Sequence, residues 1–115
     1  MKKYILASVL FISSSYANTT NYQCEGQVTG LVIEPSTGEL FAEKVGPLSW
    51  PRFCSVAKQL NGISPETCKV VYSTLLAAQT SNKEVKLWFK GSGNCEEHVA
   101  WQPMANWYFG PQLIN

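Results

Sequence analysis

The sequence predicts a small, mainly β domain with one α-helix, stapled by disulfide bonds. Short segments rich in β-branched and aromatic residues alternate with turns that contain Gly, Pro or Asn, which is typical of β-strands. One segment, residues 65–80, has both a helix start signal and helical periodicity. Four Cys in a chain of 115 residues provide the disulfides. Because the order is strands, helix, strands, we expect an antiparallel or mixed sheet with the helix packed at one face or end.

Residues 1–17 are predicted to be a secretory signal peptide. Two Lys precede a short apolar run, Tyr4–Ile12, and small residues follow it up to Ala17. The run is shorter than the roughly 20 residues that a bilayer-spanning helix needs. We therefore expect cleavage after Ala17, a single domain over residues 18–115, a secreted or periplasmic location, and no membrane insertion.

Five segments are predicted to be β-strands. Apolar and charged residues alternate in Glu84–Lys90, so Val85, Leu87 and Phe89 should share one face of this strand. Pro35 and Gly38 suit the second position and the positive-φ position of a tight turn between the first two strands. The tail 106–111 is dense in aromatic residues and ends in a Gly-Pro break. The predicted strands are Tyr22–Glu34, Glu39–Val45, Trp50–Lys58, Glu84–Lys90 and a short Val99–Trp101.

A helix is predicted from about Pro65 to Thr80. Ser64 supplies an oxygen that can cap free amides, Pro65 suits the first helical position, and Glu66 complements the helix dipole. Apolar residues at spacings of three and four form a core-facing stripe of Cys68, Val71, Tyr72, Leu75 and Ala78. A second, uncharged face is made of Val70, Thr74 and Ala77. We expect this face to be covered as well, for example by a neighbouring subunit.

The cysteines predict two structural disulfides. All four follow the signal peptide, and an even number in an exported chain is typical of paired Cys. Three pairings are possible. We favour Cys54–Cys68, which closes one loop, together with Cys24–Cys95, which ties the start of the domain to its later half. No Cys-x-x-Cys motif indicates a redox-active pair.

The inventory of polar residues excludes several classes of function. All eight acidic residues are Glu, so triads or calcium loops that need Asp are excluded, and we expect no metal and no cofactor. Removing the signal peptide changes the formal charge from +1 to −1, and a chain with this charge does not attract nucleic acid.

Glu96-Glu97-His98 places the only His beside two acidic residues, but no nucleophile adjoins it. We interpret it as a solvated loop and expect no catalytic residue; a small hydrolase would need a pocket that gathers His98 and a Glu around a hydroxyl.

Aromatic residues supply the candidate binding positions. The chain has four Trp, and Trp combines a large contact area with one N–H donor, which suits sugar and protein interfaces. Trp88 shares its strand face with Lys86 and Lys90, so it should face outward. Arg52, the only Arg, can donate two hydrogen bonds to a carboxylate such as that of a sialic acid, or pair with a Glu. The candidate ligand-binding residues are Trp88, Arg52, Lys86, Trp50 and Trp101, with core or lid packing as the competing interpretation for Trp101 and Trp107.

Several short motifs follow one another in an order that is known from other proteins. A strand ends in Arg52-Phe53-Cys54 before Cys68 and a capped helix, a turn leads into Val85–Phe89, and Phe109-Gly110-Pro111 closes the chain. This order resembles the OB-fold B subunits of pentameric bacterial toxins, above all those of subtilase cytotoxin and typhoid toxin. The helix and the following strand are also similar to the heat-labile enterotoxin B subunit. The present chain is shorter, and Cys24 and Cys95 fall elsewhere than the last Cys pair of the subtilase-like B subunits. It also looks like small exported proteins of gamma-proteobacteria, a likeness that implies no activity.

The toxin resemblance implies a fold and a function. The fold would be an OB-fold-like small antiparallel barrel, and the protein a non-catalytic subunit that binds a surface glycan or a protein partner. The assembly would be a homo-oligomer, a pentameric ring with Val70, Thr74 and Ala77 lining its centre. The alternative belongs to another class: a periplasmic inhibitor or immunity protein that blocks an enzyme or effector through an aromatic patch.

Overall fold

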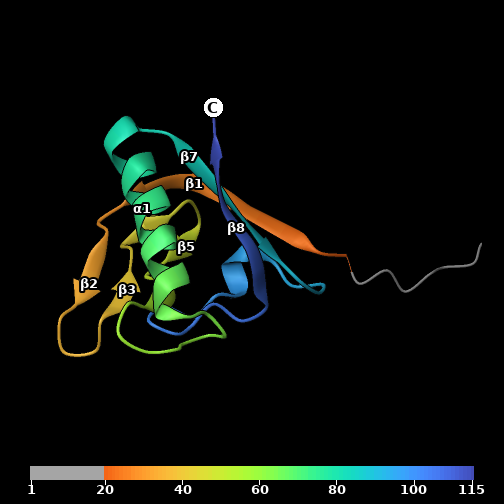
Figure 1. Ribbon diagram of the computed structural model, residues 1–115. Coiled ribbons are helices and arrows are strands. Elements are labelled where there is room, and N and C mark those ends of the chain that lie inside the picture. The colour runs from red at the N-terminus through yellow and green to blue at the C-terminus, as the bar shows by residue number, and fades with distance from the viewer. Residues whose placement is uncertain (1–19) are drawn as a thin grey trace, which may run out of the picture.

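The computed structural model describes residues 20–115, which form two antiparallel sheets with one helix packed against both (Figure 1). The predicted signal peptide at residues 1–17 lies outside the described residues. Within residues 20–115, no helix combines the length and the apolar character that crossing a bilayer requires.

The larger sheet has five strands and the smaller sheet has three. In the larger sheet the order is β5 (Leu48–Ser49), β4 (Lys44–Val45), β1 (Tyr22–Thr29), β7 (Glu84–Phe89) and β8 (Trp107–Ile114). In the smaller sheet the order is β2 (Val32–Glu34), β3 (Glu39–Phe41) and β6 (Arg52–Ser55). The helical elements are α1 (Pro65–Ser81) and a single 3₁₀ turn, η1 (Cys95–Glu97). In Figure 1, α1 has β2 and β3 to its left and β8 to its right.

One hydrophobic core is shared by both sheets and the helix. On β7 the predicted alternation is confirmed, because its three apolar residues other than Trp88 are buried. The helix buries one stripe of four residues against the same core: Cys68, Val71, Leu75 and Ala78. Leu40 and Phe53 of the smaller sheet are completely buried in this cluster. The two sheets therefore cannot separate without exposing apolar surface.

The predicted first hairpin is divided between the two sheets. The segment Tyr22–Glu34 breaks at Gly30, whose φ of 63° lies in the left-handed region. A Cβ at Gly30 would lie 2.6 Å from the Cβ of Glu43, so only glycine fits this close approach. The returning segment Glu39–Val45 divides in the same way, into β3 and β4. A hairpin that looks continuous in sequence thus contributes strands to both sheets.

Two predictions at the C-terminal end are corrected by the structure. The proposed strand Val99–Trp101 is wrong, because Trp101 has a φ of 72° and lies in a turn. The tail was predicted to end in a break at Gly110-Pro111, yet Trp107–Ile114 is strand β8. Proline is tolerated there because β8 is an edge strand with an irregular register, where one missing N–H leaves the ladder largely intact.

The predicted helix is confirmed almost to the residue. The Ser64 side chain accepts a hydrogen bond from the Thr67 amide at 3.2 Å, and the chain leaves the helix at Asn82 in a left-handed conformation. Val70, on the second face, is 65% exposed, so nothing within residues 20–115 covers it.

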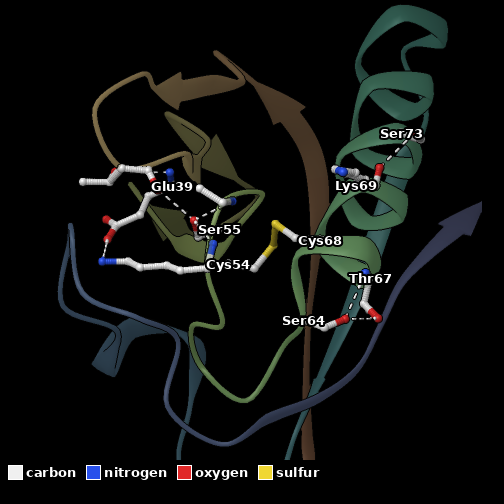
Figure 2. Close-up of a disulfide and its surroundings, with 11 residues drawn as sticks. Glu39, Cys54, Ser55, Ser64, Thr67, Cys68, Lys69 and Ser73 are labelled. Carbon is white, nitrogen blue, oxygen red and sulfur yellow. Dashed lines mark hydrogen bonds and ion pairs between the residues drawn. A yellow bond between two sulfur atoms is a disulfide. The ribbon is translucent and has the colours of Figure 1, made fainter.

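Both favoured disulfides are present. Cys24–Cys95 joins β1 to the start of η1, and Cys54–Cys68 joins β6 to the first turns of α1 (Figure 2). Two disulfides are typical of exported proteins. The predicted fold class, a small, antiparallel, mainly β domain with one helix and two disulfides, is confirmed; the described strands form two sheets and do not close into one barrel.

Removing Cys54–Cys68 with the double variant Cys54→Ala/Cys68→Ala should lower the free energy of unfolding by about 3 kcal/mol, because the bond restricts the unfolded chain. Urea unfolding measures this loss. Hydrogen exchange should show that the amides of β2, β3 and β6 lose protection first. The control Cys24→Ala/Cys95→Ala should lose about 4 kcal/mol through its longer loop, without that selective loss of protection. A loss below about 1 kcal/mol in both variants would contradict the account.

Candidate functional site

The five predicted binding residues fall in two places. Trp50, Arg52 and Trp101 gather where the link from β5 to β6 meets the link from η1 to β8. Lys86 and Trp88 lie together on the outer face of the five-stranded sheet, opposite the core. The prediction treated all five as one set, but the fold makes them two separate surfaces.

The first surface is an aromatic stack that ends in an arginine. The Trp50 and Trp101 rings are stacked, with centroids 4.2 Å apart and planes 15° apart. Phe41 lies against Trp101 at 5.7 Å, and the Arg52 guanidinium carbon lies 5.4 Å from the Phe41 ring centroid. Trp101 remains 49% exposed, so the stack is open to a ligand. We call Phe41, Trp50, Arg52 and Trp101 the Trp–Arg cluster.

The backbone of the stacked tryptophans is strained. Trp50 has a φ of 47° and Trp101 a φ of 72°, a left-handed conformation that bulky residues rarely adopt. The Trp101 amide donates to the Trp50 carbonyl at 2.9 Å, and the Trp50 amide donates to the Glu43 carbonyl at 2.9 Å. Strain of this kind costs about 1–3 kcal/mol per residue and is concentrated at functional sites. Two strained residues whose rings stack on each other therefore mark this surface as a candidate binding site.

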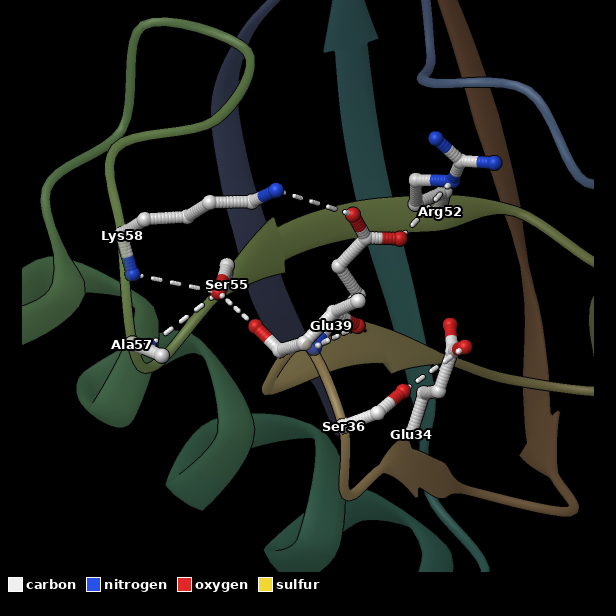
Figure 3. A network of polar contacts seen from close by, with 8 residues as sticks. Glu34, Ser36, Glu39, Arg52, Ser55, Ala57 and Lys58 are labelled. Carbon is white, nitrogen blue, oxygen red and sulfur yellow. Dashed lines mark hydrogen bonds and ion pairs between the residues drawn. The ribbon is translucent and has the colours of Figure 1, made fainter.

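Arg52 is only partly engaged within the protein. Its Nε lies 3.5 Å from a carboxylate oxygen of Glu39, too poorly aligned for a hydrogen bond, and Lys58 approaches the same carboxylate at 3.8 Å (Figure 3). Glu39 is buried, and its negative charge is shared between these two cations. In Figure 3 the two terminal nitrogens of Arg52 point away from Glu39. No hydrogen bond or ion pair within residues 20–115 engages them, so they can meet a carboxylate from outside.

The ion pair predicted as one role of Arg52 is present, with Glu39 as its partner, whereas binding of a carboxylate by Arg52 stays a prediction. Phe41 was missed by sequence reasoning because nothing in the sequence links it to Trp101. It is the last residue of β3 and is buried, so it resembles an ordinary core residue. The proximity of Trp50 and Trp101 was also not predicted, because it depends on two loops meeting.

The second surface is aromatic and cationic. Trp88 packs edge-on against Phe109 at 6.1 Å, and the Lys86 ammonium lies 5.4 Å from the Trp88 ring. Lys86 also pairs with Glu25 at 3.7 Å. The Trp88 Nε1 is buried without a hydrogen-bond partner within the described chain, while Phe109 is 59% exposed. The exposed Tyr108 ring lies 6.3 Å from that of Phe109. We call Lys86, Trp88, Tyr108 and Phe109 the outer-face patch, and its position agrees with the predicted outward direction of Trp88.

The loop that carries the only His exposes Glu96 and Glu97 to solvent, as predicted, and it also lines a pocket. The pocket has a volume of about 470 Å³ and lies between residues 91–98 and residues 102–106. Burial lowers the pKa of His98, and this effect outweighs contacts with the backbone of Trp50 and Ser49, which raise it. The pKa of Tyr22 is raised, first by burial and then by the nearby negative charge of Glu97. His98 and Glu97 therefore share a pocket, which the interpretation as a solvated loop did not foresee.

The described residues offer no metal site, because no three His, Cys or Glu side chains among residues 20–115 are placed to share an ion. Comparisons of the chain with protein-family models, with curated proteins and with solved structures gave no match. The candidate function accordingly rests on the geometry of the two aromatic surfaces and the pocket.

Stability should fall as the pH is lowered through the range in which His98 titrates. Because the pKa of His98 in the folded chain lies below its ordinary value of 6.5, the unfolded chain binds more protons just below that pH. The His98 contribution is therefore complete above its ordinary pKa of 6.5 and is lost progressively as the pH falls below that value. Urea midpoints should fall more for the wild type than for His98→Gln over this range. An equal fall in both proteins would show that His98 is not responsible.

Proposed function

We propose that this protein is a non-catalytic binding module that recognises an acidic surface glycan through the Trp–Arg cluster. The observation that carries the proposal is the free pair of terminal nitrogens of Arg52 beside the half-exposed Trp101 stack. A guanidinium matches the planar geometry of a carboxylate, and an exposed indole face packs against the apolar face of a sugar ring. A sialic acid presents both groups on one ring.

The resemblance of the sequence to toxin B subunits supports the same class of ligand. In this proposal Trp50 supports Trp101 from behind, and Phe41 holds the guanidinium carbon of Arg52 in place. Glu39 fixes the Nε end of Arg52 and leaves the other two nitrogens for the ligand. The strain at Trp50 and Trp101 is then the cost of presenting a preformed surface.

Binding of sialyl-lactose, measured by titration calorimetry, should be at least about ten-fold tighter than binding of lactose. Arg52→Lys should remove this preference, because lysine keeps the charge but loses the paired donors. The control Lys69→Gln removes one positive charge from an exposed helix position and should leave the preference unchanged. Equal affinity for both sugars in the wild type, or no binding of either, would contradict the proposal.

We further propose that the protein assembles into a pentameric ring in which the exposed face of α1 lines the centre. Val70 is 65% exposed and lies on the uncharged face predicted to be covered. Sedimentation should give the mass of a pentamer, and Val70→Glu should yield monomers because it would bring five like charges together. Lys69→Glu, one position away, is the control and should keep the ring. A monomeric wild type would contradict the ring without affecting the glycan site.

A second candidate function is that of an inhibitor or immunity protein that blocks an enzyme or effector. The outer-face patch favours it, because exposed Phe109 and Tyr108 beside Trp88 supply the aromatic surface that is enriched at protein interfaces. This function would be preferred if the wild type is a monomer that binds neither sialyl-lactose nor lactose.

A further inference from the structure

Two accessible oxygens meet beside Gly93 in the pocket next to η1. The pocket has a volume of about 470 Å³, within the range of small-molecule sites. Gly93 does not have a positive φ, so its backbone conformation would accept another residue. A Cβ at this position, however, would lie 3.2 Å from the Tyr22 hydroxyl and 3.2 Å from Oε2 of Glu97. Because both oxygens approach one point above Gly93, one ligand atom in the pocket can contact both.

Both oxygens are held in place by the surrounding structure. The Tyr22 ring stacks on Phe89, with centroids 5.0 Å apart and planes 9° apart, which fixes the direction of its hydroxyl. Asn94, the residue that caps η1, donates a hydrogen bond from its side-chain nitrogen to Oε1 of Glu97 at 3.2 Å. The disulfide Cys24–Cys95 fastens η1 to β1. A ligand would therefore meet a preformed pair of acceptors.

Neither oxygen is engaged or enclosed within residues 20–115. Oε2 of Glu97 makes no hydrogen bond and no ion pair there, and Glu97 is exposed. The Tyr22 hydroxyl also has no hydrogen-bond partner in this part of the chain, and it is not one of the buried unpaired atoms. Tyr22, Gly93 and Glu97 all line the pocket, so a molecule that enters it can reach both oxygens.

Glu97 gives this end of the pocket a negative charge that the described residues leave unpaired. Lys90 lines the pocket as well, but its ammonium lies 5.3 Å from the centroid of the Tyr108 ring, and Tyr108 is not a lining residue. Burial lowers the pKa of His98 below its ordinary value of 6.5 and outweighs backbone contacts that raise it. His98 is therefore uncharged at neutral pH, and the negative charge favours a cationic ligand.

We propose that this pocket binds a small molecule that carries a primary ammonium group, with the ammonium between Oε2 of Glu97 and the Tyr22 hydroxyl. A primary ammonium has three N–H donors and no acceptor, so it suits two oxygens that face one point. Its hydrogen bond to a carboxylate is about twice as strong as one between neutral groups. The carbon part of the ligand would lie along the apolar lining residues Val99, Pro103 and Ala105.

The inference does not rest on the proposed recognition of acidic glycans. None of the four residues of the Trp–Arg cluster lines this pocket. The two surfaces also favour ligands of opposite charge, because the cluster offers a guanidinium and the pocket a carboxylate. Binding at one surface can therefore be measured without the ligand of the other.

The test is an NMR titration of the isotope-labelled wild type at about pH 7, where amines are largely protonated. The probes are methyl β-glucosaminide, cadaverine and the neutral methyl β-glucopyranoside. At least one of the two amines should shift the amide signals of residues 91–98 in a saturable manner. The neutral glucoside should bind at least about ten-fold more weakly, because it lacks the ammonium. Comparison of the two amines shows whether a sugar or an alkyl chain is the better carrier of that group.

Variants of the two oxygens test their roles separately. Glu97→Gln should weaken amine binding about ten-fold or more, because it removes the charge and keeps the shape of the side chain. Glu96→Gln is the matched control: Glu96 is the adjacent exposed carboxylate, does not line the pocket, and should bind within about two-fold of the wild type. Tyr22→Phe keeps the aromatic stack and should weaken binding about three-fold or more. Gly93→Ala should also weaken it, because the added methyl would crowd both oxygens.

Three outcomes would overturn the proposal. The first is that neither amine shifts these amides, and the second is that the neutral glucoside binds as tightly as the amines. The third is that Glu96→Gln and Glu97→Gln weaken binding equally, which would show general attraction to acidic residues only. Amide spectra show whether each variant is folded, and Tyr22→Phe decides if Glu97→Gln is not. Failure here would leave the binding of sialyl-lactose unchanged, so it is distinguishable from failure of the Trp–Arg cluster.

Discussion

The helix α1 holds the two sheets together, and the Cys54–Cys68 bond fixes that junction. The helix contacts β1, β7 and β8 of the larger sheet and β6 of the smaller one. Cys54 and Cys68 are both completely buried. The smaller sheet has only short strands and would have marginal stability alone. In a domain of this size the hydrophobic core is thin, so a covalent link through the helix supplies much of what keeps the sheets in register.

The same junction positions the candidate site. Arg52 is the first residue of β6, a strand of the smaller sheet, and Trp50 lies just before it. Trp101 and Pro103 lie in the link that leads into β8 of the larger sheet. A backbone bridge between Arg52 and Pro103 and the amide of Trp101 bonded to Trp50 join the two links. The aromatic stack therefore exists only when both sheets are in place. Its geometry is rigid because two loops, each tied to a different sheet, constrain it.

Local signals made much of the fold predictable, and contacts between distant segments account for the rest. The helix cap at Ser64 and the alternating burial along the strand that contains Trp88 each depend on only a few neighbouring residues, and both predictions are confirmed. The division of the first hairpin depends on the approach of Gly30 to Glu43, which a local pattern cannot reveal. At the site, residue types alone indicated Arg52 and the tryptophans. The sequence contained no sign that Phe41 would join them or that His98 would line a pocket, because both depend on how loops meet.

The central claim is that Arg52 and Trp101 form one site for an acidic sugar, and a crystal structure with bound sialyl-lactose tests it most directly. The account predicts the sugar carboxylate within hydrogen-bond distance of both terminal nitrogens of Arg52, with a ring of the ligand packed on the exposed face of Trp101. Density for the sialic acid on the outer-face patch instead, with Arg52 still free, would contradict it.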